Sequence, residues 1–174
     1  MTSDIDALAA VLHATAPHAP LADRLETFGR FVGAWDLEWH GIGSDGLEVV
    51  VPGELTFGWI LGGRALQDVW RVPLDPADAR RMRAFHGTTV RFYDPAIDAW
   101  RSTWLDPVNG RIRRFIGRPL EGGDIVLDGL DDDPRERWSF HEVTSDSFRW
   151  LGEASTDGGR TWSVTDEMLA RRRR

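Results

Sequence analysis

The sequence predicts an all-β fold, a single up-and-down antiparallel β-barrel of about ten strands preceded by one or two short N-terminal helices. From Trp35 onward, apolar and polar residues alternate, which is typical of strands with one buried face. Turn-forming residues interrupt this alternation about every eight to twelve positions, and nearly every connection is short enough for a hairpin. An open meander of this size would leave two strand edges exposed, so we expect the sheet to close.

Residues 1–31 are expected to form the helical segment. The stretch "DIDALAAVLHA" has apolar residues at helical spacing, and Pro17 and Pro20 interrupt it. The stretch "LADRLETFGRFVG" then resumes the helical period until its glycine ends it. The barrel is expected to occupy residues 34–171, and no linker or change in composition divides residues 1–174 into more than one domain.

The strand boundaries are set by clusters of Gly, Asp, Asn and Pro, which favour turns. The longest connection, "PLDPADARRMRA", is charged and is expected to hold about one helical turn. The ten expected strands cover approximately residues 34–43, 48–60, 64–72, 84–93, 99–105, 111–118, 124–129, 135–143, 147–155 and 161–171.

The stretch "STDGGRTW" at residues 155–162 resembles the Asp-box of sialidases and related β-propellers. A propeller needs about four to eight blades with a recurring signature, and this motif occurs once. We therefore expect it to be the turn between the ninth and tenth strands. Asp157 would accept hydrogen bonds from backbone N–H groups of the turn, and Trp162 would fold back as a plug.

The residue types that are missing exclude several kinds of site. All 21 basic residues are arginine and cysteine is absent, which excludes lysine chemistry, disulfides and thiolate metal sites. The histidines show no metal-ligand spacing, so no metal is expected. The net charge of −7 argues against a nucleic-acid partner, and Arg171–Arg174 is interpreted as a solvated tail that finishes the last strand. No apolar run approaches the roughly 20 residues that cross a bilayer, which favours a cytoplasmic protein without a membrane partner.

A second motif lies where the barrel begins. In "FVGAWDLEWHGIG", Gly33 and Trp35 form a Gly-x-Trp that is similar to the signature of lipocalins and the wider calycin group. The stretches "FGWILGGRALQDVW", "GTTVRFYDPAIDAWRSTW" and "STDGGRTWSVTDEMLARR" resemble successive blocks of bacterial lipocalin-like proteins of unknown function. The resemblance implies a closed barrel with an internal cavity and a structural role for Trp35. It implies no particular activity, because this scaffold carries many functions.

No cofactor is expected. Nitrobindin-like haem proteins share the early Gly-x-Trp, and resemblance to them would imply an iron-ligating histidine in a strand near the C-terminus. The final strand, "TWSVTDEMLARRRR", contains no histidine. His141, in the eighth strand, shares a face with Arg137 and Ser139, opposite Trp138 and Phe140.

The alternation also predicts which side chains face the barrel interior. The apolar sets are Trp35/Leu37/Trp39, Leu55/Phe57/Trp59, Leu66/Trp70, Val90/Phe92, Trp100/Trp104, Ile112/Ile116, Ile125/Leu127, Trp138/Phe140, Phe148/Trp150 and Trp162/Val164/Met168. Polar residues interrupt these sets at Asp68, His86, Thr88, Ser102, Arg114 and Asp166. A buried charge needs a partner, and the simplest arrangement pairs Arg114 with Asp68 or Asp166.

These inward positions supply the candidate site. Tryptophans can stack flat, conjugated ligands, although they can equally fill a barrel that has no cavity. The polar residues can anchor a ligand carboxylate or hydroxyl, unless strand register or a position at the barrel end exposes them to water. The predicted ligand-binding residues are Trp39, Trp59, Asp68, Trp70, His86, Thr88, Trp104, Arg114 and Trp138.

Three functions are compatible with this reading. The first is binding of a small hydrophobic or aromatic molecule inside the barrel. The second is an isomerase or cyclase of a hydrophobic metabolite that uses His86 with Asp68 or Arg114 for proton transfer or charge stabilisation. The third is a structural protein with a filled barrel that forms a homodimer.

Overall fold

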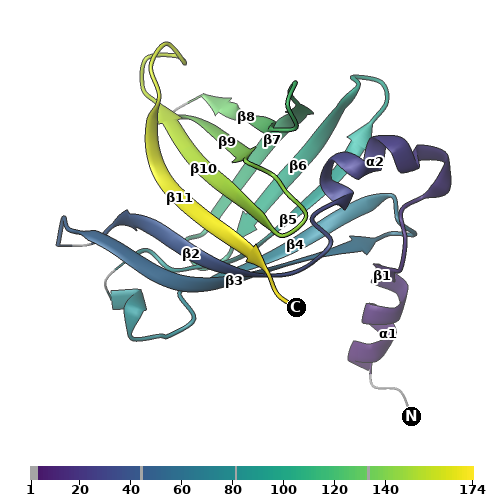
Figure 1. Cartoon of the computed structure of the whole chain (residues 1–174), viewed down its shortest axis with the longest axis horizontal. Helices are drawn as coiled ribbons and strands as arrows, with labels where there is room; N and C mark the ends of the chain where they lie inside the picture. The colour runs from purple at the N-terminus through teal and green to yellow at the C-terminus, as the bar shows by residue number, and fades with distance from the viewer. Residues whose placement is uncertain (1–3, 44, 81, 133) are drawn as a thin grey trace.

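Ten antiparallel strands close into an up-and-down barrel, which confirms the predicted fold class (Figure 1). The computed structural model describes residues 4–43, 45–80, 82–132 and 134–174. Each strand from β2 to β11 pairs with the next along the chain, and β11 pairs with β2 to close the sheet. These strands are β2 (Gly33–Ile42), β3 (Glu48–Ile60), β4 (Ala65–Val72), β5 (Phe85–Asp94), β6 (Ala99–Asp106), β7 (Arg111–Pro119), β8 (Ile125–Asp132), β9 (Arg135–His141), β10 (Ser147–Ser155) and β11 (Ser163–Arg172).

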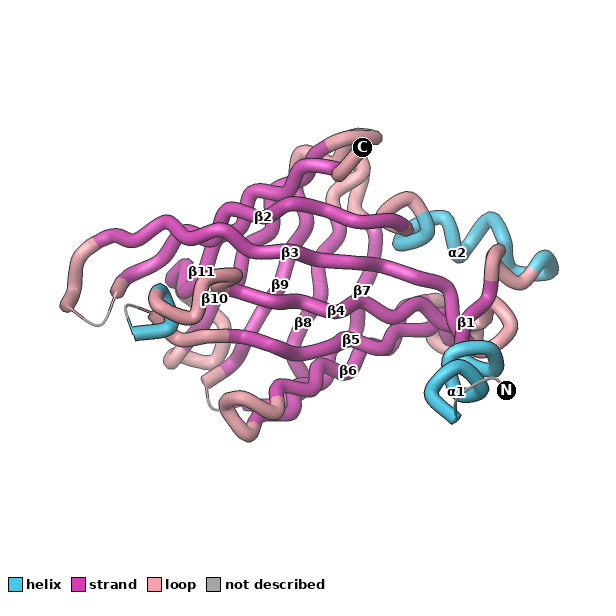
Figure 2. The backbone as a smooth tube through the Cα atoms, turned by 90° about the horizontal axis from the view of Figure 1, so that it is seen from below, coloured by secondary structure: helices cyan, strands magenta, loops and turns pink. Residues whose placement is uncertain are grey.

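The helical elements lie mainly before the barrel. They are α1 (Asp4–Leu12), the 3₁₀ turn η1 (Ala19–Leu21), α2 (Ala22–Gly29) and the 3₁₀ turn η2 (Asp78–Arg80) in the long β4–β5 connection. Between α1 and η1, the two-residue strand β1 (His13–Ala14) pairs with the end of β3. Figures 1 and 2 show α2 at one end of the barrel, with the β2–β3 hairpin projecting at the other.

The end of the barrel beside α2 is filled by aromatic side chains. Leu25 and Phe28, one helical turn apart, are buried on the inner side of α2, and Phe31 follows them into the core. The Phe28 ring lies 4.8 Å from that of Trp100, and the Phe31 ring lies 5.0 Å from that of Phe140. This packing closes one end of the interior, so any cavity must open at the other.

The Gly-x-Trp motif is anchored by the C-terminal arginines. Trp35 is fully buried, and the guanidinium of Arg172 lies 4.1 Å from its ring centroid. Arg172 also donates hydrogen bonds to the carbonyls of Val32 (2.7 Å), Arg30 (2.7 Å) and Ser145 (2.6 Å). The interpretation of the terminal arginines as a solvated tail is therefore wrong for Arg172, which ties the last strand to the start of the first.

Two strands present the opposite face to the interior from the one predicted. In β5, Thr89 and Arg91 are buried whereas Phe92 is 44% exposed, and in β7 Phe115 is buried whereas Ile112 is 60% exposed. Strand register requires this, because side chains of paired residues share a face and Thr89 pairs with the buried Asp68. Val164 in β11 also points outward. It pairs with Glu153 of β10, and the register of these two strands shifts between Gly152 and Glu153.

The Asp-box forms the hairpin between β10 and β11, as predicted. The Asp157 carboxylate accepts hydrogen bonds from the backbone N–H groups of Arg160 (2.9 Å) and Thr161 (2.9 Å) and from the Thr161 hydroxyl (2.7 Å). These donors stabilise the charged form and lower the pKa of Asp157. Trp162 is not a plug, since it is half-buried and lies under the guanidinium of Arg137, 4.2 Å from the ring centroid.

Candidate functional site

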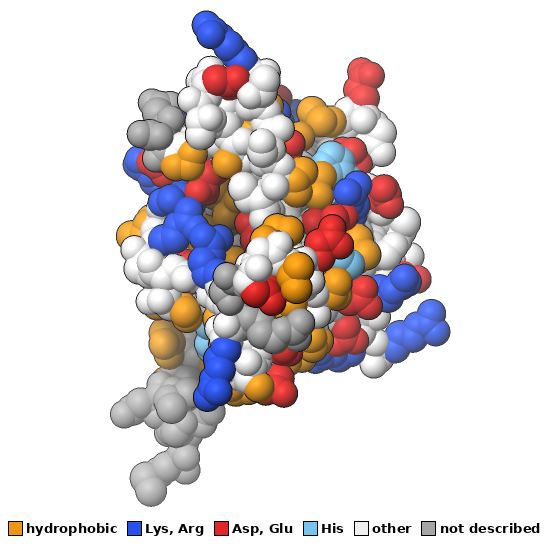
Figure 3. Space-filling view, turned by 90° about the vertical axis from the view of Figure 1, so that its left-hand side faces the viewer, with side chains coloured by type: hydrophobic (Ala, Val, Ile, Leu, Met, Phe, Trp, Pro, Cys, Tyr) orange, Lys and Arg blue, Asp and Glu red, His pale blue; other side chains and the backbone are white. Residues whose placement is uncertain are grey.

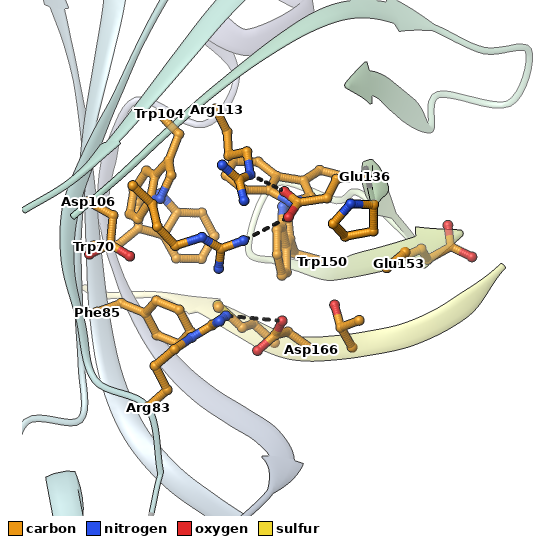
Figure 4. Close-up of a pocket in the computed structure, with 16 residues that line it drawn as sticks. Trp70, Arg83, Phe85, Trp104, Asp106, Arg113, Glu136, Trp150, Glu153 and Asp166 are labelled. Atoms are coloured by element: carbon orange, nitrogen blue, oxygen red, sulfur yellow. Dashed lines mark hydrogen bonds and ion pairs between the residues drawn. The ribbon is translucent and has the colours of Figure 1, made fainter. Parts of the chain in front are cut away.

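A pocket of about 220 Å³ lies inside the barrel at the end opposite α2 (Figure 4). Its apolar lining is mainly aromatic and comprises Trp70, Phe85, Trp104, Trp138, Trp150, Met168, Pro134 and Ala154. Its charged lining comes from the loop before β5 and from the ends of β6, β7, β9, β10 and β11, and comprises Arg83, Asp106, Arg111, Arg113, Glu136, Glu153 and Asp166. Figure 3 views this end of the molecule and shows arginine, acidic and hydrophobic side chains intermixed around it.

Four tryptophans from β4, β6, β9 and β10 form a closed cycle in the pocket wall. The ring centroids of Trp70 and Trp104 are 6.4 Å apart, those of Trp104 and Trp138 are 5.9 Å apart, and those of Trp138 and Trp150 are 5.3 Å apart. Trp150 and Trp70 complete the cycle at 5.5 Å. All four contacts are edge-to-face, which is a preferred geometry for aromatic pairs.

Two glycines make room for these indoles. A Cβ on Gly87, in β5, would come within 2.5 Å of the Trp104 ring, and a Cβ on Gly152, in β10, would come within 2.9 Å of the Trp150 ring. A larger residue at either position would clash with an indole of the wall, and at Gly87 also with the Leu105 carbonyl. The glycines therefore set the shape of the aromatic wall.

The indole N–H groups of the wall differ in their partners. Trp70 donates to the Asp68 carboxylate at 2.7 Å, behind the pocket surface. Trp150 lines the pocket, and its side chain is only 5% exposed. Its indole N–H is buried and has no hydrogen-bond partner among the described residues. An unpaired buried donor costs about 1–3 kcal/mol. Because the Trp150 nitrogen is closed to the pocket, this cost belongs to the packing of the aromatic wall.

One side of the rim carries two guanidinium groups on a single carboxylate. Arg111 and Arg113 lie two residues apart on β7 and both face the pocket. Arg111 Nη2 is 2.8 Å from one Glu136 oxygen, and Arg113 Nε is 3.1 Å from the other (Figure 4). This cluster therefore has one positive charge in excess.

The opposite side of the rim is built around Asp166. Its carboxylate accepts a hydrogen bond from the Trp39 indole N–H at 3.1 Å and lies 3.9 Å from the guanidinium of Arg83. Asp106, which is buried at the end of β6, accepts hydrogen bonds from the Asn109 backbone (3.2 Å) and side chain (2.7 Å). These two carboxylates thus already have donors from the protein.

The structure brings three of the predicted ligand-binding residues together, because Trp70, Trp104 and Trp138 all line the pocket. Trp39 lies just outside the lining, where it contacts Asp166 and packs 6.3 Å from Phe85. Trp59 lies at the other end, against the last turn of α2 at Gly29. These two tryptophans face inward as predicted but belong to the supporting core.

The polar candidates do not converge on the pocket. Asp68 faces the interior but is fully buried in an ion pair with Arg91. His86 and Arg114 are exposed on the outer face of the barrel, where Arg114 lies 3.6 Å from Asp131. Placing them inside was wrong, because β5 and β7 have the opposite register.

Thr88 also lies on the outer face, where its hydroxyl donates to the Asp68 carbonyl. The predicted pair of Arg114 with Asp68 or Asp166 is therefore not formed: Arg91 and Arg83 are the arginines that lie beside these carboxylates.

Sequence reasoning missed Arg111, Arg113, Glu136 and the unpartnered N–H of Trp150. Trp150 was placed on an inward face, but nothing in the sequence separates it from a core tryptophan. Arg111 and Arg113 carried a usable signal, since they alternate with Phe115 and occupy the first residues of β7, where a strand reaches water.

Two further observations concern metal ligands and membrane-spanning helices. Within residues 4–43, 45–80, 82–132 and 134–174, no group of three or more His, Asp or Glu side chains is arranged to hold a metal ion. Over the same residues, no helix combines the length and the apolar character needed to cross a membrane.

The comparisons with known proteins support the fold. The structure is similar to Rv2717c from M. tuberculosis, with a TM-score of 0.61 and 15% identity over 88% of this chain and 99% of that one. It is also similar to the S-type phycobiliprotein lyase CPES from Guillardia theta, with a TM-score of 0.55 and 14% identity over 86% of this chain and 92% of that one. The barrel is lipocalin-like. No protein-family model and no curated protein sequence matches the chain.

Proposed function

We propose that the protein binds a small aromatic molecule in the pocket at the open end of the barrel. The observation that carries this proposal is the continuous wall of four tryptophans that lines a cavity of about 220 Å³. A barrel whose interior serves stability alone would bury these rings completely, whereas here one side of the wall faces a pocket. A flat ligand would restore those contacts by stacking on the indoles.

A similar barrel occurs in a protein described as a phycobiliprotein lyase. At 14% identity this likeness concerns the fold, so the proposed activity depends on the pocket.

The enzyme hypothesis with His86, Asp68 and Arg114 has no geometric support. Asp68 is inside the barrel and His86 outside, so these two cannot act together on one substrate. Arg114 lies outside as well, beside Asp131, and neither it nor His86 lines the pocket. Formation of a homodimer and a cytoplasmic location stay predictions that the pocket neither favours nor opposes.

Tryptophan fluorescence provides the test. Titration with a panel of one- and two-ring aromatic compounds should quench the emission and saturate at one ligand per chain. Trp104→Leu removes one wall of the pocket and should weaken binding at least tenfold, whereas Trp162→Leu, on the outer side, should bind like the parent chain. If no compound binds, or if both variants bind equally well, the proposal is wrong.

A further inference from the structure

We infer that the ligand is an aromatic carboxylate of one or two rings, with its ring among the four tryptophans and its carboxylate at Arg111 and Arg113. This inference rests on the proposed function and specifies the ligand class. It follows from three properties of the pocket: the balance of hydrogen-bond donors and acceptors, the charge of the rim and the volume of the cavity.

The first property is a surplus of donors. The Asp106 and Asp166 carboxylates already accept hydrogen bonds from the protein, and Glu136 lies against two guanidinium groups. The fourth carboxylate of the lining, Glu153, points away from Arg113 and Glu136 (Figure 4). A guanidinium carries five N–H donors and no acceptor, so Arg111 and Arg113 retain donors beyond those directed at Glu136. A complementary ligand must therefore supply acceptors.

The second property is charge. The whole lining carries three arginines and four carboxylates, so its positive excess is local. The cluster of Arg111, Arg113 and Glu136 carries two positive charges and one negative charge on side chains that are only 28%, 25% and 15% exposed. Limited contact with water strengthens the attraction of such a cluster for an anion. A carboxylate matches guanidinium geometry because two parallel N–H groups can donate to its two oxygens.

The third property is size. A dry protein cavity of about 150 Å³ holds a benzene molecule. The pocket, at about 220 Å³, therefore suits one or two fused rings. A wall of four indoles favours a flat ring over an aliphatic chain, because aromatic rings can stack on it or meet it edge-to-face.

A matched ligand series separates this inference from simple aromatic binding. Calorimetric titrations would compare naphthalene-2-carboxylate with naphthalene-2-carboxamide and with 2-naphthylmethylammonium, which share the ring and differ in charge. The carboxylate should bind about tenfold more tightly than the amide, as expected for a charge-assisted contact, and the ammonium should bind most weakly.

Variants on one strand then identify the residue responsible. Arg113→Gln should lower the affinity for the carboxylate about tenfold and leave the amide unchanged. Arg114→Gln, the adjacent position on the outer face, is the matched control and should change neither. Glu136→Gln should raise the affinity for the carboxylate several-fold, because it removes the negative charge that competes for both arginines.

The outcomes distinguish the two proposals. If the amide or the ammonium binds as tightly as the carboxylate, or if Arg113→Gln and Arg114→Gln have equal effects, the ligand class is wrong while aromatic binding stands. If none of the three ligands and no member of the aromatic panel binds the parent chain, the proposed function itself fails.

Discussion

Replacing Asp68 with asparagine should destabilise the barrel more than any other isosteric substitution in its core. The Asp68 carboxylate is fully buried, pairs with the buried Arg91, and accepts hydrogen bonds from Trp70 Nε1 (2.7 Å) and the Thr89 backbone (3.0 Å). Asparagine can keep the two hydrogen bonds through its oxygen but removes the charge. Arg91 would then hold an uncompensated positive charge in the core, against the Phe28 ring 4.6 Å away.

The expected magnitude follows from the cost of a buried charge without a partner. Removing one member of a buried ion pair costs about 3–5 kcal/mol of the free energy of unfolding. At about 2–4 °C per kcal/mol for a chain of this size, the melting temperature should fall by roughly 6–20 °C. Burial raises the pKa of Asp68 and lowers the pKa of Arg91, because desolvation of each charge outweighs their mutual attraction. The pair itself therefore contributes little net stability.

Thermal and urea unfolding of three variants would test this reasoning. Asp68→Asn should show the full loss, and the double variant Asp68→Asn/Arg91→Met should recover most of it because no charge is left buried. Arg91→Met alone should become more stable as the pH falls. The pKa of Asp68 is raised in the folded protein, so its carboxyl binds a proton at a higher pH in the folded chain than in the unfolded chain. A loss below about 1 kcal/mol in Asp68→Asn, or a double variant no more stable than that single one, would refute the argument.

Two further predictions concern the hairpin of the Asp-box and the C-terminus. Because the pKa of Asp157 is lowered in the folded protein, its contribution is present above the ordinary value of 3.8 and is lost as the pH falls through the folded pKa. Asp157→Asn should therefore lower the urea midpoint at pH 7 and leave ligand affinity unchanged. The urea midpoint of this variant should also fall less steeply in acid than that of the parent chain. A midpoint that falls in parallel with that of the parent chain would contradict this. Arg172→Leu should cost about 2–4 kcal/mol in thermal unfolding through its lost carbonyl contacts and its stacking on Trp35, whereas Arg171→Leu, which is exposed, should cost almost nothing. Equal losses would contradict the anchoring role.

The fold could be predicted because its signals are local and repeated. Alternation and turn residues placed the strands within a few residues of their bounds, and short hairpin connections left closure as the way to pair the edges. The Asp-box was placed correctly for the same reason, since its hydrogen bonds join residues close in sequence. The contact of Arg172 with Trp35 joins the last strand of the barrel to the first, and these residues are far apart in the sequence. No local pattern could therefore predict it.

The interior of the site was harder to predict because β5 and β7 are apolar on the wrong face. In β7, "RIRRFIG" places Ile112 and Ile116 in alternation, yet Phe115 is the buried residue and the isoleucines point outward. A single-strand pattern cannot reveal this, because register is fixed by the neighbouring strands. The error moved Arg114 inside and Arg113 outside, which hid the charged rim of the pocket.

A buried charge could have corrected the register of β5. The face of β4 was predicted correctly, so Asp68 was known to be inside and to need a cationic partner. Strands β4 and β5 are joined sequentially and pair as a hairpin, which makes an arginine on β5 a nearer partner than Arg114 on β7. Arg91 is the only arginine in β5. Placing it inward forces Thr89 inward and His86 outward, as in the structure, so pairing a charge across adjacent strands predicts more than the hydrophobicity of either strand alone.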